Sequence, residues 1–140
     1  MKRRLSLAFI LGLIALASSC SLGKGKELGE GGVVQFHNQF NALQYKQIYA
    51  GASEAFRKSA TEADVIALFE TLHTKLGNMK QSTQSGWQVN STDVGTTVSL
   101  DYSTDFAEGN GTEKFVFLVT GEKASLFNYN VNSPLLVAAQ

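Results

Sequence analysis

The hydrophobic residues of this chain change their spacing once, near Met79, and this change restricts the fold more than any other feature of the sequence. Before it, apolar side chains recur every three or four residues, the period of an amphipathic helix. After it, they alternate with polar side chains, the period of a β-strand. A helical part followed by a stranded part predicts an α+β domain, with helices packed on one face of a curved antiparallel sheet.

Two helical segments are expected in residues 33–56. The first carries an apolar stripe with members three or four residues apart: Val33, Phe36, Phe40 and Leu43. The second covers residues 45–56, and Gly51 and Ser53 within it indicate a bend or a break. Each segment therefore offers one apolar face to a core.

The third helix has signals at both ends. Thr61 is a good N-cap, Glu62 and Asp64 place negative charge in the first turn, and Gly77 follows the last apolar residue as a C-cap. Its expected apolar face consists of Val65, Leu68, Phe69, Leu72 and Leu76. These signals predict a helix over residues 62–76.

Four strands are expected after the change of period, at residues 86–90, 97–106, 114–120 and 126–132. Residues 114–120 are apolar on both faces, as in a covered central strand. The last strand is expected to place Phe127, Tyr129 and Val131 on its core face. Short polar connections rich in Gly, Asn, Asp and Ser favour an antiparallel meander.

Residues 44–77 read QYKQIYAGASEAFRKSATEADVIALFETLHTKLG, with Tyr49, Phe56, Arg57 and the Leu76-Gly77 pair at characteristic places. Over residues 33–132 the chain resembles the nuclear transport factor two-like (cystatin-like) superfamily, and within it small bacterial envelope domains of unknown function. The resemblance implies a cone-shaped fold with a pocket between a long helix and the concave face of the sheet. In the enzymes of this superfamily, an Asp or a His in the pocket acts as a base and a Tyr or a protonated Asp stabilises an oxyanion.

Six residues are candidates for lining such a pocket: His37, Tyr49, His73, Trp87, Tyr102 and Tyr129. The alternative is that each histidine lies at the edge of an apolar stripe and makes one hydrogen bond, while the aromatic residues are core. Asp101 and Asp105 alternate with apolar residues and are expected to face solvent, where a carboxyl group keeps its ordinary pKa. No catalytic residue is therefore assigned.

Composition excludes several classes of partner. From Cys20 onward nine basic residues face twelve acidic ones, a formal charge of −3, so nucleic-acid binding is not expected. A single cysteine and two histidines 36 positions apart form no metal-binding group. No cofactor motif is present in the sequence, because the glycine-rich stretch of residues 23–32 follows no strand and lacks the Gly-Lys-Ser/Thr ending.

The N-terminus has the features of a secretory signal. Lys2, Arg3 and Arg4 precede thirteen nearly uninterrupted apolar residues, too few for a membrane span of about 20 residues. The stretch LASSC at residues 16–20 resembles a lipobox. The resemblance implies cleavage before Cys20 and acylation of its sulfur and new amino group. Ser21, where an Asp would imply inner-membrane retention, favours the outer membrane; the alternative is a plain secreted protein.

The predicted organisation is a lipoprotein signal peptide at residues 1–19, the lipidated Cys20 with a flexible tether at residues 20–32, and one domain at residues 33–140. Twelve flexible residues span about 20 Å. The expected function is a lipid-anchored envelope protein facing the periplasm, a non-catalytic module for a protein partner or a small apolar ligand. The alternative is a small isomerase- or hydratase-like enzyme using a pocket His or Asp. The sequence leaves the oligomeric state open, a dimer included.

Overall fold

Helices come first along the chain and strands follow. The structure, a computed structural model, describes residues 17–137, with side chains from Leu22 onward. Its elements are α1 (Ala17–Asn41), α2 (Tyr45–Gly51), α3 (Glu54–Ser59), α4 (Glu62–Leu76), β1 (Met79–Thr92), β2 (Gly95–Phe106), β3 (Asn110–Thr120), β4 (Lys123–Asn132) and α5 (Pro134–Val137). The prediction of an α+β chain with helices before a four-stranded antiparallel sheet is confirmed. Most of the predicted signal peptide, residues 1–16, lies outside the described residues.

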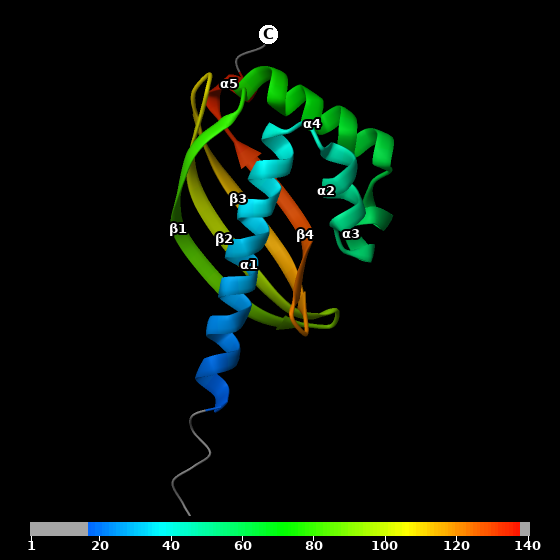
Figure 1. Cartoon of the computed structure of the whole chain (residues 1–140), viewed down its shortest axis with the longest axis vertical. Helices are drawn as coiled ribbons and strands as arrows, with labels where there is room; N and C mark the ends of the chain where they lie inside the picture. The colour runs from blue at the N-terminus through cyan, green and yellow to red at the C-terminus, as the bar shows by residue number, and fades with distance from the viewer. Residues whose placement is uncertain (1–16, 138–140) are drawn as a thin grey trace, which may run out of the picture.

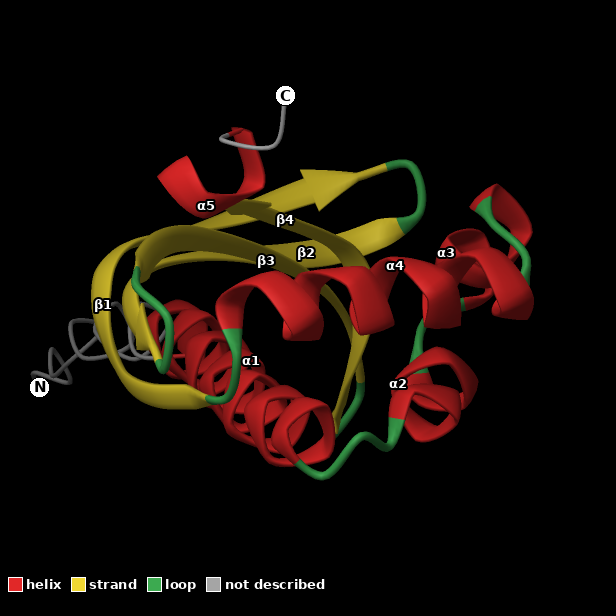
Figure 2. Ribbon diagram, turned by 90° about the horizontal axis from the view of Figure 1, so that it is seen from above, coloured by secondary structure: helices red, strands yellow, loops and turns green. Residues whose placement is uncertain are grey.

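The sheet is a meander of order β1-β2-β3-β4, and every neighbouring pair is antiparallel. It bends around α1, which runs along its concave side, while α4 crosses one end of the sheet (Figures 1 and 2). α2 and α3 lie beside α4 and complete the helical layer (Figure 2). The predicted break within residues 45–56 is confirmed, since α2 ends at Gly51 and α3 begins at Glu54.

The core lies between the helical layer and the concave face of the sheet. The buried apolar side chains that form it include Val33, Phe36, Phe40, Phe69, Leu76, Leu100, Phe115 and Phe117. The rings of Phe36, Phe69 and Phe115 meet edge to face, with the centroid of Phe36 at 5.6 Å from that of Phe69 and 5.1 Å from that of Phe115. Aromatic packing of this kind leaves little free space between α1 and the sheet.

The flexible tether predicted for residues 20–32 is wrong over residues 22–32. These residues belong to α1, which is continuous from Ala17 to Asn41, and Gly25 and Gly29 are buried under the sheet. Their composition was typical of a linker, but the helix is stabilised by tertiary packing and not by the propensity of its residues. None of the helices in residues 17–137 has both the length and the apolar character of a membrane span.

The glycines of α1 explain this packing. Gly25, Gly29 and Gly32 recur at intervals of four and three residues and therefore share one face of the helix. Added Cβ atoms would meet Val98 at Gly25 and Gly29, and Phe117 at Gly32. These three glycines let the backbone of α1 lie directly on the side chains of β2 and β3.

The boundaries of α4 follow the sequence prediction. Thr61 Oγ1 accepts a hydrogen bond from the Asp64 backbone N–H at 3.2 Å, and Gly77 ends the helix with a φ of 74°. The Gly77 N–H donates to the carbonyl oxygen of His73 at 2.8 Å. One prediction for this helix is wrong: Leu68 is 52% exposed and takes no part in the core.

We expect Thr61→Ala to lower the free energy of unfolding by about 1 kcal/mol, because it leaves the Asp64 N–H without its capping acceptor. Thr61→Ser keeps that acceptor and is the matched control. Urea denaturation of the two variants measures the difference. Equal stability of both would contradict the capping role of Thr61.

The predicted inward face of the last strand is partly wrong. β3 and β4 change register between Val116 and Phe117, and Phe127 is the extra residue at this bulge. Leu126 therefore takes the buried position, with 5% of its surface exposed, and Phe127 is only half-buried. Tyr129 and Val131 still lie on the core side, as expected.

Candidate functional site

The six residues predicted to line one pocket lie in separate places. His37 and Tyr129 meet in the core, and Tyr102 lies beside them as the cross-strand partner of Glu113. His73 is on a groove between α2 and α4. The remaining two, Tyr49 and Trp87, belong to neither place.

Tyr49 and Trp87 have local roles. The Tyr49 hydroxyl lies 3.0 Å from each of the carbonyl oxygens of Arg57 and Ala60 and holds the end of α3. Trp87 on β1 is 49% exposed, and the Lys26 ammonium of α1 lies 5.6 Å from its ring centroid. This cation–π contact fastens α1 to the first strand of the sheet.

The most unusual polar group in the described residues is Glu113 on β3, which is 2% exposed. Its Oε2 accepts a hydrogen bond from Thr104 Oγ1 at 2.6 Å, and its Oε1 accepts one from the Tyr129 hydroxyl at 2.7 Å. His37 Nε2 lies 2.8 Å from Oε2. We name these four residues the Glu113 cluster; it joins α1 to β2, β3 and β4.

The carboxyl group of Glu113 is fully paired. Both carboxyl oxygens of Glu113 have partners, because the hydroxyl groups of Thr104 and Tyr129 donate to them and His37 Nε2 lies within hydrogen-bond distance of Oε2. Burial, and then the Glu113 carboxylate, raises the pKa of Tyr129 well above its usual 10.0. Such a network resembles a catalytic set in composition, with an acid, a base and a phenol.

Three members of the Glu113 cluster are nevertheless buried. His37 is 3% exposed and Thr104 is 1% exposed, and the ring of Phe115 packs against His37 with the centroids 5.6 Å apart. The groove between α2 and α4 and a small cavity beside Phe117 are not lined by a member of the cluster. Tyr129 is the one member of the cluster that is only partly buried.

Sequence reasoning missed Glu113, although a signal was present. Glu113, Phe115 and Phe117 alternate along β3 with Lys114 and Val116 and therefore share one face of the strand. The expected strand begins at Lys114, because Glu113 follows the glycine-rich stretch of residues 109–111 and fits a polar turn. Extending the expected strand to Glu113 would have placed the carboxyl group of this residue on the core face, beside Phe115.

Asp101 and Asp105 behave as expected. Both lie on the face of β2 that points away from the helices, where Asp105 is exposed and Asp101 is half-buried. Asp101 Oδ1 lies 4.0 Å from Lys114 Nζ across the strand pair, at the limit of an ion pair. This surface pair contributes little to stability.

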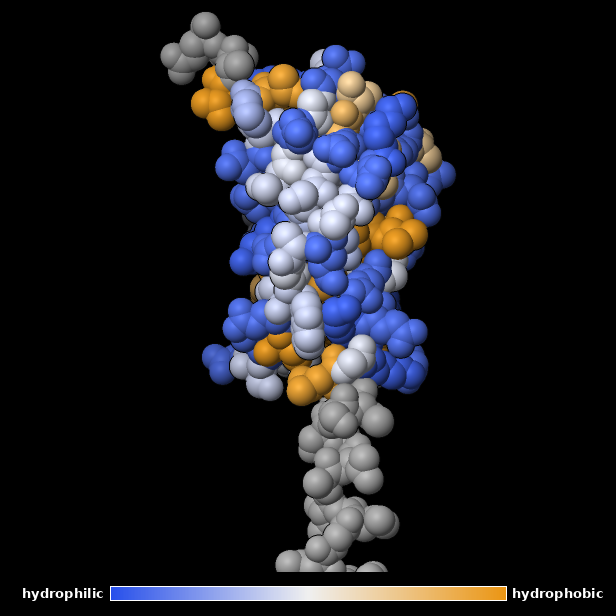
Figure 3. All heavy atoms as spheres, turned by 90° about the vertical axis from the view of Figure 1, so that its left-hand side faces the viewer, coloured by the Kyte–Doolittle hydropathy of each residue, from blue (hydrophilic) through white to orange (hydrophobic). Residues whose placement is uncertain are grey.

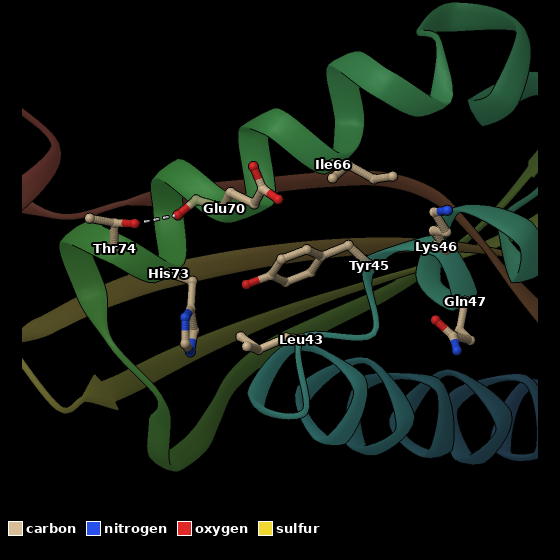
Figure 4. A pocket seen from close by; sticks show the side chains of 8 residues that line it. All are labelled: Leu43, Tyr45, Lys46, Gln47, Ile66, Glu70, His73 and Thr74. Atoms are coloured by element: carbon tan, nitrogen blue, oxygen red, sulfur yellow. Dashed lines mark hydrogen bonds between the residues drawn. The ribbon is translucent and has the colours of Figure 1, made fainter.

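An open groove of about 590 Å³ lies between α2 and α4, beyond the C-terminal end of α1 (Figure 4). Its lining residues are Leu43, Tyr45, Lys46, Gln47, Ile66, Glu70, His73 and Thr74. The Tyr45 ring extends from the start of α2 toward His73 on α4 (Figure 4). Burial, and then Glu70, raises the pKa of Tyr45.

The groove combines apolar walls with a polar rim. Leu43 is 58% exposed, and its φ of 59° is the only positive value among the non-glycine residues described. His73 Nε2 lies 2.6 Å from Asn78 Oδ1, so its one side-chain hydrogen bond matches the alternative left open by the sequence. Lys46 and Glu70 bring opposite charges to the rim.

No three His, Cys, Asp or Glu side chains come close enough to hold a metal ion in the part of the chain that the structure describes. No protein-family model matches the chain, and no curated protein matches its sequence at a significant level. The two sites are therefore characterised by their own geometry: a mostly buried polar cluster and an open groove.

The raised pKa of Tyr129 predicts that the folded chain loses stability at alkaline pH. The pKa of Tyr129 is raised by burial in the folded chain, so the unfolded chain loses this proton first as the pH rises above 10.0. The contribution of Tyr129 to stability is thus complete below pH 10.0 and is lost as the pH rises toward its folded pKa. We expect the free energy of unfolding to fall above pH 10.0, less steeply in Tyr129→Phe. Urea denaturation at several pH values tests this, and identical slopes would contradict it.

Proposed function

We propose that this chain is a lipid-anchored protein of the bacterial cell envelope, attached to the outer membrane through an acylated Cys20. Its folded part binds a protein partner in the periplasm and catalyses no reaction. The basic start, the short apolar run and the LASSC stretch support the anchor. The burial of His37 and Glu113 supports a non-catalytic role, because almost none of the surface of either side chain is accessible from solution.

The space between α1 and the sheet is filled by side chains. This observation favours a protein partner over a small apolar ligand. The cavity there, bordered by Phe36, Phe117 and Leu126, measures about 50 Å³. Pockets that enclose small ligands measure about 300–1,000 Å³ and bury most of the ligand surface. The larger groove at α2 and α4 is open, which suits a side chain or a segment of a partner.

The backbone of Leu43 supports the groove as the binding surface. A leucine at a φ of 59° costs roughly 1 kcal/mol, and glycine or asparagine is the usual residue at such a helix end. Here the chain keeps a leucine and leaves 58% of its surface exposed. Residues in such strained conformations cluster at active sites and ligand-binding sites.

We also propose that the fold is the cone-shaped, cystatin-like arrangement of the nuclear transport factor two-like superfamily. The helical layer on the concave face of a bent meander supports this assignment. The interior differs from what the resemblance implies, because aromatic side chains occupy the place of the pocket. A solved structure of a superfamily member that superimposes on β1–β4 and α1 would test it.

The enzyme alternative depends on the composition of the Glu113 cluster. It requires α1 to move away from β3, so that a substrate can reach His37 or Glu113. Hydrogen exchange of the buried amides measures such an opening. Exchange of the α1 amides faster than global unfolding would favour the enzyme, and exchange only through global unfolding would favour the binding module.

The anchor is tested with Cys20→Ala. We expect the wild-type chain to fractionate with membranes and to carry the mass of its acyl chains, and the variant to lose both. Cys20→Ser is a second variant that keeps the size of the side chain and removes the thiol. A wild-type mass without acyl chains would refute the anchor.

The groove is tested with a photo-crosslinking residue in place of Gln47. We expect a discrete adduct with one protein, lost in Leu43→Asn because asparagine tolerates the backbone conformation and removes the apolar contact. Leu68→Asn is the matched control, since Leu68 is also an exposed leucine (52%) but does not line the groove. An adduct that survives Leu43→Asn, or one also formed by a probe at Asp105 on the far face, would refute this assignment.

A further inference from the structure

We infer that α1 couples the anchor rigidly to the domain, so that one end of the folded domain lies directly on the lipid headgroups. This inference rests on the proposed acylation of Cys20. A rigid α1 gives the domain a fixed orientation, which a flexible tether would not. A defined surface of the domain then touches the membrane, and the groove is held away from it.

The first support is the short distance between Cys20 and the packed part of α1. Gly25 is buried, and an added Cβ there would lie 3.4 Å from Val98 on β2. Five residue steps separate Cys20 from Gly25, which is about 8 Å as a helix and at most about 17 Å as a fully extended chain. A headgroup layer is roughly 5–8 Å thick, so even an unwound first turn keeps this end of the domain at the membrane surface.

The second support is the set of segments that lie at this end. Lys24 Nζ lies 2.7 Å from Glu122 Oε2, which places the start of α1 beside the β3–β4 turn. The β1–β2 turn lies at the same end. Thr96, near the start of β2, pairs with Val119, which lies just before the β3–β4 turn. Figure 1 shows both turns and the start of α1 at the base of the molecule. We name these three segments the base.

The base carries exposed apolar side chains. Leu22 at the start of α1 is 50% exposed, and Val94 in the β1–β2 turn is 53% exposed. Figure 3 shows hydrophobic residues at the surface of the base, and others at the opposite end of the described part. Two exposed apolar residues from segments 72 positions apart thus share the surface that faces the lipid.

Charge does not select a particular lipid at the base. Residues 17–24, 92–95 and 120–123, which form the base, contain two basic residues, Lys24 and Lys123, and two acidic residues, Asp93 and Glu122. Because these charges cancel, attraction to anionic headgroups contributes little. We therefore expect contact with uncharged and anionic bilayers alike, and little dependence on salt.

The same geometry sets the position of the groove. α1 ends at Asn41, whose side chain bonds to both backbone groups of Met79 at the opposite end of the domain. The 21 residue steps of helix from Cys20 to Asn41 span about 30 Å. Leu43 and the groove follow directly after this helix, so a partner would be bound about 30 Å above the membrane surface.

The inference is tested with the full lipidated chain, purified from membranes and placed in phosphatidylcholine vesicles that contain lipids with a nitroxide on the headgroup. Val94→Cys carries an environment-sensitive fluorophore at the base. Glu108→Cys carries the same label in the β2–β3 turn at the opposite end. We expect the label at position 94 to lose most of its fluorescence and shift its emission to the blue, and the label at position 108 to change little.

Three results would overturn the inference, and they are distinguishable. Equal quenching of the two labels in a lipidated, vesicle-bound chain would refute the fixed orientation alone. A mass without acyl chains would refute the anchor, and this inference with it. A blue shift of the label at position 94 in vesicle-free Cys20→Ala protein would show that a second copy of the chain covers the base.

An inserted linker tests whether a continuous α1 sets the orientation of the domain, or whether the base lies at the membrane only because the anchor is close to it. A Gly-Ser segment inserted between Ser21 and Leu22 leaves the anchor and the packed helix intact. We expect it to reduce quenching of the label at position 94 strongly. Unchanged quenching would show that α1 does not set the orientation.

Discussion

Glu113→Ala is expected to lower the free energy of unfolding by about 3–5 kcal/mol, the largest effect of any single substitution considered for this chain. The substitution removes the acceptor of Thr104 and Tyr129 and leaves His37 buried without a partner. A buried polar group that loses its partner bears the full cost of its desolvation. Urea denaturation of the protein that begins at Ser21 measures the loss.

Two controls define this prediction. Glu108→Ala removes an exposed glutamate and is expected to change stability by less than about 0.5 kcal/mol. Glu113→Gln keeps the size of the side chain but offers only one acceptor oxygen, so we expect an intermediate loss. A loss below about 1 kcal/mol for Glu113→Ala would contradict the burial and hydrogen bonding of this carboxyl group.

The second prediction compares two adjacent glycines of α1. A Cβ at Gly31 would meet nothing within 4 Å, whereas a Cβ at Gly32 would lie 2.6 Å from Cε1 of Phe117, which is 3% exposed. Replacing a helical glycine with alanine contributes about 1 kcal/mol through helix propensity at either position. Overpacking against the buried ring of Phe117 costs about 1–3 kcal/mol at Gly32 alone.

We therefore expect Gly31→Ala to be more stable than the wild type by about 1 kcal/mol, and Gly32→Ala to be less stable than Gly31→Ala by about 1–3 kcal/mol. Chemical denaturation of both variants gives the difference directly. A flexible tether would make both substitutions nearly neutral. Equal stabilisation by the two substitutions would show that α1 does not pack on β3 at Gly32.

Much of the fold could be predicted because its signals are local. Thr61 and Gly77 bound α4 through hydrogen bonds within a few residues, and the alternation along β2 places Leu100 and Tyr102 inward and Asp101 outward. The break before α3 follows from Gly51 and from Ser53, whose hydroxyl accepts from the Phe56 N–H. Each of these features needs only neighbours in sequence, so one sequence is sufficient to find it.

The candidate sites could not be predicted in the same way. The Glu113 cluster brings together residues 37, 104, 113 and 129 from four elements, and no spacing in the sequence connects them. The groove depends on how α2 packs beside α4, and on a leucine that breaks the expected core stripe by adopting a left-handed conformation. The residues that were predicted to line a single pocket thus lie in three places: the core, the groove and the surface.

The sequence by itself determined the order of helices and strands, the ends of α4 and the side of β2 that faces the core, because these follow from backbone hydrogen bonding and side-chain period. Only the tertiary structure decided that the glycine-rich stretch is a helix and that Glu113 is buried. Glycines at positions 25, 29 and 32 favour a linker in isolation. They favour close packing once β2 and β3 lie against them, and a carboxylate tolerates the core only where three hydrogen-bonding side chains from distant segments surround it.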